Sequence, residues 1–182
     1  MSEIETGTGI GSEVESAGEA EGTAATPTAA EMERLVPGME STGPLIGIIM
    51  GSESDRPVME KACVELDERA LSYEVRVISA HRNPKEVAAY AENAALRGIR
   101  VLICGAGMAA ALPGVVAAYT DLPVIGVPIA SGGLGGMDAL LAIAQMPPGV
   151  PVGCMAIGGA RNAAIFASRI LAQRGTSILA GE

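Results

Sequence analysis

Residues suited to binding a phosphorylated ligand follow the first apolar segment of the chain. They read Met50-Gly51-Ser52-Glu53-Ser54-Asp55 and stand directly before a helical pattern. Glycine permits a tight turn, the two hydroxyls can donate hydrogen bonds, and the helix start adds free N–H groups and a positive dipole end. Asp55 can accept hydrogen bonds from sugar hydroxyls. Ser54 and Asp55 would equally serve as a simple helix cap, so this loop alone does not define a site.

The only histidine of the chain, His81, lies in a second polar loop, Ser79-Ala80-His81-Arg82-Asn83-Pro84. An imidazole exchanges protons near neutral pH, and the planar fork of an arginine suits a phosphate. A lone histidine is more often structural than catalytic. Because His81 follows a predicted strand, next to Arg82 and a helix opened by Pro84, we predict a functional role for it.

Small residues fill two further loops. Residues 105–114 read Gly-Ala-Gly-Met-Ala-Ala-Ala-Leu-Pro-Gly, and they can contribute backbone N–H groups and close approach to a ligand. Residues 128–136 end in Gly-Gly-Leu-Gly-Gly. This fourth loop is flexible enough to close over a ligand, and it also suits a loose connection.

Alternating apolar runs and helical patterns predict the elements that position these loops. The runs are short, rich in β-branched residues and bounded by Gly, Pro or Ser, as in strands buried on both faces: Leu45–Met50, Tyr73–Ile78, Val101–Cys104, Val124–Val127 and Val152–Ile157. The helical patterns have apolar residues three and four apart: Arg56–Ala70, Pro84–Arg97, Leu112–Tyr119, Met137–Gln145 and Arg161–Gln173. The order predicts an α/β fold, a parallel sheet between two helix layers (an αβα sandwich), flavodoxin-like or Rossmann-like. Ligands of such sheets bind beyond the carboxyl ends of the strands, where the four loops lie.

Charge divides the chain into an acidic extension, residues 1–43, and a nearly neutral domain, residues 44–182. The extension carries nine Glu and one Arg, whereas the domain carries twelve acids and eleven bases. We expect the extension to be disordered, apart from a possible short helix at Ala29–Leu35, because it has few large apolar residues to bury. The charge argues against a nucleic-acid partner.

The remaining composition predicts a cytoplasmic protein without a metal site built from its cysteines. No apolar run is long enough for a membrane span, and no signal or transit peptide is recognisable. Cys63, Cys104 and Cys154 lie in apolar patterns without the spacing of metal ligands, so we expect buried free thiols.

Taken in order, the motifs resemble the phosphoribosylaminoimidazole carboxylase family, catalytic-subunit type, and its bacterial N5-carboxyaminoimidazole ribonucleotide mutases in particular. The resemblance covers about residues 44–173. It is carried by the two polar loops, by Gly105-Ala106-Gly107 with Leu112-Pro113-Gly114, by Pro123–Pro128, and by Gln145-Met146-Pro147 with Gly149–Val152.

The resemblance implies a cofactor-free mutase that moves a carboxyl group from nitrogen to ring carbon C4 of an aminoimidazole ribonucleotide by releasing and recapturing CO2. It implies a homo-octamer with active sites at subunit contacts. His81 would transfer the proton. The residues implied in substrate binding are Ser52, Ser79 and Arg82 at the phosphate, Asp55 at the ribose, and Ser54, Gly107, Met108, Ala111 and Leu112 around the pocket.

Two positions of the third loop keep other functions open. The mutases usually read Gly-Ala-Gly-Gly-Ala-Ala-His-Leu-Pro-Gly, so Met108 replaces a glycine and Ala111 a histidine. Alanine at that point resembles the direct aminoimidazole ribonucleotide carboxylases, which use CO2 or bicarbonate, although those usually have lysine in place of Arg82. A carboxylase acting on another nucleotide, or a binding paralogue without efficient chemistry, would also fit. The chain stops at Glu182, where members of the resembled family commonly continue into a further helix, so we expect either a weaker octamer or a substitute contact by the acidic N-terminal extension.

Overall fold

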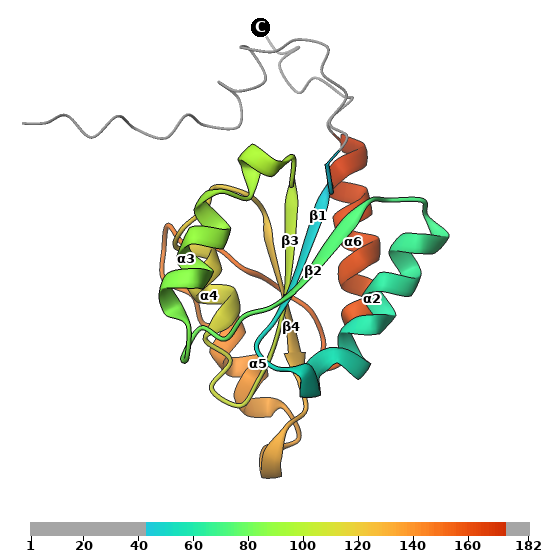
Figure 1. The fold of residues 1–182 in the computed structure, drawn as a ribbon. Coiled ribbons are helices and arrows are strands. Elements are labelled where there is room, and N and C mark those ends of the chain that lie inside the picture. Colours follow the sequence, from blue (N-terminus) through green and yellow to red (C-terminus); the bar gives the residue numbers. More distant parts are fainter. Residues whose placement is uncertain (1–42, 174–182) are drawn as a thin grey trace, which may run out of the picture.

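The computed structural model describes residues 43–173, in which five parallel strands form one sheet. The strands are β1 (Ile46–Met50), β2 (Tyr73–Val77), β3 (Val101–Gly107), β4 (Val124–Ile129) and β5 (Gly153–Cys154). Their order across the sheet is β2-β1-β3-β4-β5, which is the flavodoxin-like order. Because all four pairings are parallel, the carboxyl ends of the strands meet at one edge (Figure 1).

Helices cover both faces of the sheet, so the predicted three-layer αβα fold is confirmed (Figure 1). One layer consists of α2 (Arg56–Glu68) and α6 (Ala160–Ala172). The other consists of α3 (Pro84–Glu92), α4 (Leu112–Ala117) and α5 (Met137–Ala144). Each layer has its own apolar core against the sheet.

Small side chains bring α6 close to the sheet and to α2. The buried positions of this helix are all alanines three or four residues apart, which is one face of a helix: Ala160, Ala163, Ala164 and Ala167. A buried carboxylate, Glu65 of α2, also joins the two helices. It accepts hydrogen bonds from Arg69 at 2.7 Å and from Arg161 of α6 at 2.6 Å.

Two glycines of the resemblance motifs are required by packing. A Cβ on Gly105 would overlap the Met59 sulfur of α2. A Cβ on Gly114 would lie 3.2 Å from the sulfur of Met146, so α4 and the chain after α5 pack closely. This contact places the Leu-Pro-Gly and Gln-Met-Pro motifs against each other.

Several predictions about single elements differ from the structure, as in β3, which ends at Gly107 rather than at Cys104. The second predicted helix ends at Glu92, and a separate 3-10 turn at Ala95–Arg97 follows before Gly98 adopts a left-handed φ of 95°. Only Gly153–Cys154 pair as a strand within the predicted 152–157 run, although Met155 and Gly158 still donate backbone hydrogen bonds to the β4 segment. The prediction that every strand is buried on both faces is wrong for β2 and β5, the two edge strands of the sheet, neither of which has a buried residue.

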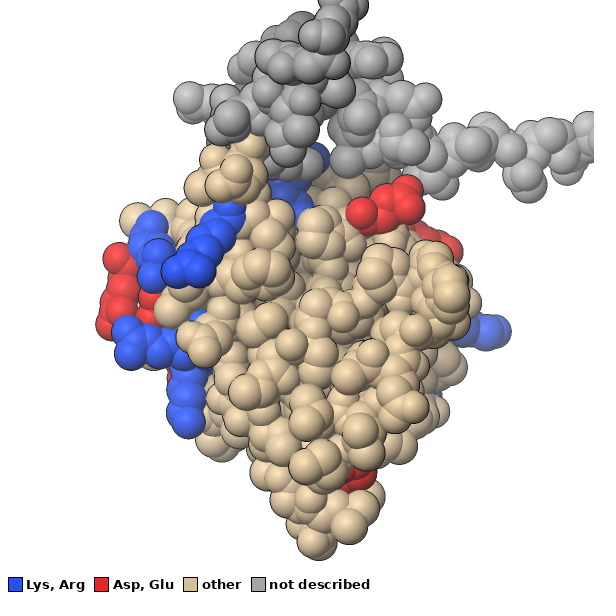
Figure 2. Space-filling model, turned by 180° about the vertical axis from the view of Figure 1, so that it is seen from behind, with Lys and Arg blue, Asp and Glu red and all other residues tan. Residues whose placement is uncertain are grey.

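The structure also bears on the predictions about the cysteines, the membrane span and the surface charge. Cys63, Cys104 and Cys154 are free thiols; the first two are buried and the third is partly exposed. Among residues 43–173 no helix is long and apolar enough to cross a membrane. Seen from behind, the charged side chains lie near the margins of the molecule and the middle of that face is uncharged (Figure 2). The predicted helix at 29–35 lies outside the described residues.

Candidate active site

The four loops at the carboxyl edge of the sheet enclose one pocket of about 250 Å³. It is lined by the turn after β1, the loop after β2, the end of β3 with the start of α4, and one residue after β4. Its lining residues are Gly51, Ser52, Ser54, Asp55, Ser79, Ala80, His81, Ala106, Gly107, Met108, Ala110, Ala111, Leu112 and Ser131. The topology rule applied to the sequence therefore located the pocket.

Two hydroxyls are held together in the turn after β1. Ser52 caps the 3-10 helix η1 (Glu53–Asp55), and its Oγ accepts from the Ser54 backbone N–H at 3.3 Å. The Ser54 hydroxyl donates to the same Oγ at 2.9 Å. Asp55 stands at the N-cap position of α2, as predicted, but its side chain makes no capping hydrogen bond. Its carboxylate is thus available to the pocket.

Asp55 is a nearly buried carboxylate, with 7% of its surface exposed. Burial raises the pKa of this carboxyl, since a charged group loses hydration there. Backbone N–H groups of Ser52 and Gly51 and the Arg82 guanidinium act in the opposite direction on the same pKa. The fold thus holds the Asp55 carboxylate, which has lost most of its hydration, next to groups that can donate hydrogen bonds to it.

Arg82 connects the two polar loops. Its Nη2 donates to the Gly51 carbonyl oxygen at 2.8 Å. Its backbone N–H lies 3.4 Å from the Ser79 Oγ, which accepts from it, and Asn83 donates to the Ser79 carbonyl at 2.8 Å. Arg82 itself is exposed and stands at the margin of the pocket rather than in its lining.

The third loop forms an apolar wall with a strained backbone. Met108 and Ala110 have φ values of 55° and 35°, a region that L-residues other than Asn and Asp seldom adopt. The Ala110 backbone N–H donates a hydrogen bond to the Gly107 carbonyl oxygen at 3.0 Å, which closes the turn before α4. Ala111 and Leu112 complete this wall. No side chain of this wall can ionise.

His81 is exposed and lines the pocket at the end of β2. The lining residues with ionisable carboxyl or imidazole groups are His81 and Asp55 alone. Their environments differ, because Asp55 is buried and His81 is accessible to solvent. Among residues 43–173, no group of three or more His, Cys, Asp or Glu side chains is placed so that it could hold a metal ion.

The structure brings together nine of the ten residues named from the sequence, and it places Arg82 beside them. Sequence reasoning missed Ser131, which lines the pocket directly after β4. Its position in the sequence could have indicated it, since Ser131 is the first polar residue after the fourth strand. Ala80, Ala106 and Ala110 were also missed, and alanine carries no chemical signal of its own.

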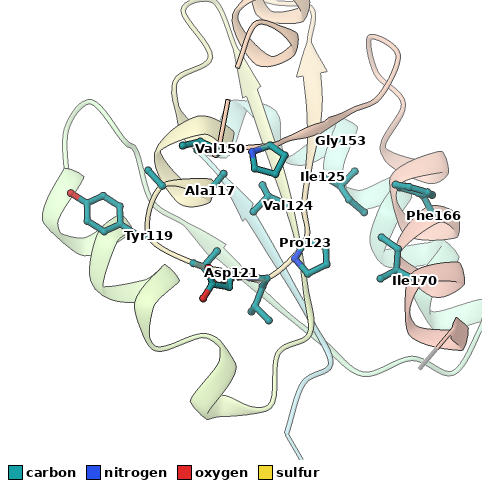
Figure 3. A pocket seen from close by; sticks show the side chains of 15 residues that line it. Ala117, Tyr119, Asp121, Pro123, Val124, Ile125, Val150, Gly153, Phe166 and Ile170 are labelled. Carbon is teal, nitrogen blue, oxygen red and sulfur yellow. Dashed lines mark hydrogen bonds between the residues drawn. The ribbon is translucent and has the colours of Figure 1, made fainter. Parts of the chain in front are cut away.

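A larger hollow of about 860 Å³ lies at the opposite end of β4 and β5 (Figure 3). The labelled side chains around it are mostly apolar, with Asp121 and Tyr119 as the ionisable ones (Figure 3). It is far from the strand ends that carry the polar loops, so we assign the chemistry to the smaller pocket.

The fold and pocket define an α/β protein with a polar pocket at the switch point of a flavodoxin-like sheet. The sequence model of AIR carboxylase matches residues 45–180. This chain belongs to the AIR carboxylase family.

Several curated relatives are similar over most of this domain. The N5-carboxyaminoimidazole ribonucleotide mutase of Pyrococcus horikoshii is 56% identical over 137 residues, covering 75% of this chain and 77% of that protein. The protein of the same name from Mycobacterium tuberculosis (strain H37Rv) is 57% identical over 128 residues, covering 70% and 74%. The phosphoribosylaminoimidazole carboxylase of Schizosaccharomyces pombe is 55% identical over 137 residues, which is 75% of this chain and 25% of that longer protein.

A solved structure gives the same result for the fold. The crystal structure of Treponema denticola PurE aligns with a TM-score of 0.64 at 32% identity, covering 71% of this chain and 80% of that one.

Proposed function

We propose that this protein is an N5-carboxyaminoimidazole ribonucleotide mutase of purine biosynthesis. The observation that carries the proposal is the convergence of His81, Asp55, Ser52 and Ser79 in one pocket. Relatives with 52% to 57% identity that bear the mutase name support it. The catalytic unit is residues 44–182, with residues 1–43 as an extension outside it.

The polar loops would bind the ribose phosphate. Ser52, Ser54 and Ser79 offer hydroxyl donors, and Arg82 has further guanidinium N–H groups besides the one bound to Gly51. Charge-assisted hydrogen bonds to a phosphate are the strong ones, so Arg82 supplies most of this affinity. Asp55 is an acceptor for ribose hydroxyls. The apolar wall then faces the aminoimidazole ring.

His81 would move the single proton that the reaction transfers from carbon. The N–C bond of the carbamate breaks to give CO2, and the amine nitrogen gains a proton. Carbon C4 then attacks CO2 to form the new C–C bond, and His81 removes the C4 proton, so that the ring regains its aromaticity. The net reaction is an isomerisation in which no proton is gained or lost overall. An imidazole accessible to solvent can take up and return that proton near neutral pH.

The deciding experiment offers the purified protein two substrates in parallel. Formation of the C4-carboxylated product from N5-carboxyaminoimidazole ribonucleotide, without added bicarbonate, is the expected result. Product only from aminoimidazole ribonucleotide with bicarbonate would make the protein a direct carboxylase instead. No product from either substrate would refute both and favour a carboxylase of another nucleotide or a binding paralogue.

The direct carboxylase is the second candidate because of Ala111. This residue lines the pocket with only a methyl group, at the point where mutases usually carry a histidine. The high identity to proteins named as mutases and the arginine at position 82 favour the first candidate.

Assembly into a homo-octamer in the cytoplasm completes the proposal. Large apolar side chains are exposed in and near the turn η3 (Gly132–Leu134) and α5: Leu134 is 68% exposed, Met137 52% and Leu141 49%. Apolar exposure of this extent suits a contact between subunits. The three free thiols suit a reducing compartment. Light scattering should give about 146 kDa, eight times the chain mass of 18.3 kDa, whereas a monomer would refute the octamer.

A further inference from the structure

Met108 combines an unfavourable backbone with an exposed side chain. Its φ of 55° lies in the left-handed region, where a Cβ is crowded by the following carbonyl group. The residue is also 61% exposed, so its long apolar side chain is not held by the core. Neither local conformation nor burial explains a methionine here.

The position of Met108 in the pocket offers an explanation. It lines the pocket and is exposed, so it lies at the rim, next to the methyl groups of Ala110 and Ala111. The preceding residue cannot carry a side chain, because a Cβ on Gly107 would lie 2.9 Å from the Cβ of Ser131 and 3.1 Å from the Ile129 carbonyl. Position 108 is therefore the first position after the end of β3 at which a side chain can extend the apolar wall toward the rim of the pocket.

We propose that the Met108 side chain is the part of this wall that retains CO2 between its release and its capture by carbon C4. This inference rests on the proposed mutase function. CO2 is small, carries no net charge and gains little from polar donors, so an apolar barrier delays its escape better than a hydrogen bond would. A thioether on a flexible, unbranched side chain can cover an irregular opening without a fixed fit.

The test measures how much CO2 is lost to solvent during turnover. The protein is given unlabelled N5-carboxyaminoimidazole ribonucleotide in buffer containing 13C-bicarbonate and carbonic anhydrase, and the labelled fraction of the product is read by mass spectrometry. For Met108→Gly, we expect this fraction to rise at least about threefold over the wild type, because several dispersion contacts around one small molecule are lost.

The same variant should be more stable than the wild type. Glycine adopts a positive φ without a steric penalty, so Met108→Gly should raise the melting temperature by roughly 2–4 °C. The matched control is Ala70→Gly, since Ala70 has a φ of 52°, is exposed and follows α2 away from the pocket. It should show the same gain in stability and an unchanged labelled fraction.

Met108→Gln tests whether apolar character matters, because glutamine has a similar length and a polar end. We expect its labelled fraction to lie between those of the wild type and Met108→Gly.

A labelled fraction in Met108→Gly equal to that of the wild type would overturn the inference. A change of oligomer mass without extra label would also overturn it, because it would assign Met108 to a subunit contact. Absence of product from the wild type itself would refute the proposed function, and the inference with it.

Discussion

Replacing Arg82 by alanine tests the proposed phosphate site most directly. The guanidinium bridges the two polar loops through the 2.8 Å hydrogen bond to the Gly51 carbonyl, and it has further N–H groups that can donate to a phosphate. A hydrogen bond that involves a charged group contributes about 1.5–3 kcal/mol. Loss of one such bond to the phosphate therefore weakens binding by about 10- to 150-fold, at about 1.4 kcal/mol per factor of ten.

The assay is isothermal titration of aminoimidazole ribonucleotide together with steady-state kinetics. Arg82 binds a part of the ligand that does not react, so KM should rise while kcat changes much less. The matched control is Arg76→Ala, which removes another exposed arginine, paired with Glu74 at 3.4 Å and outside the pocket lining. Unchanged affinity in Arg82→Ala, or an equal loss in the control, would refute the phosphate assignment.

Three further variants test single groups. His81→Ala should lower kcat by about 10²- to 10⁴-fold with ligand affinity retained, measured by the same two methods, and undiminished turnover would exclude it as the proton-transfer group. Asp55→Asn should raise the melting temperature at pH 7: burial raises the pKa of Asp55, so its charged form destabilises the fold above that pKa, and the gain should shrink as the pH falls through it. A stability difference that does not depend on pH would contradict this reasoning. Glu65→Gln should have the opposite sign, because hydrogen bonds from Arg161 and Arg69 lower the pKa of Glu65. The carboxylate then stabilises the fold above its ordinary pKa and loses this effect as the pH falls through the lowered value, so melting curves of variant and wild type should converge in acid and differ at neutral pH.

The strand order of the sheet could be predicted only in outline. Alternating β and α patterns determined a parallel sheet, and the connection rules placed the four loops at one edge. Tyr73–Val77 was predicted to be buried on both faces, although its alternating charged residues, Glu74 and Arg76, are typical of a half-exposed strand, and β2 indeed lies at one edge of the sheet. The patterns did not indicate that only Gly153–Cys154 pair with β4, since strand pairing depends on neighbours far away in the sequence.

The site residues with polar side chains were predictable and the others largely were not. His81, Asp55 and the serines carry recognisable chemistry at predicted strand ends. The burial of Asp55 was not predictable, because it depends on how the loops after β1 and β2 fold against each other. The left-handed backbone of Met108 was also hidden, since an alanine-rich loop predicts no positive φ at a methionine.

The hydrogen bond between Arg82 and Gly51 also bears on the kinetics of binding. It holds the loops after β1 and β2 at a fixed separation in the protein without ligand. These loops therefore lose their conformational entropy when the chain folds. Little further entropy is lost when substrate binds. Association should accordingly be a single fast step, limited by diffusion and orientation rather than by rearrangement of the loops.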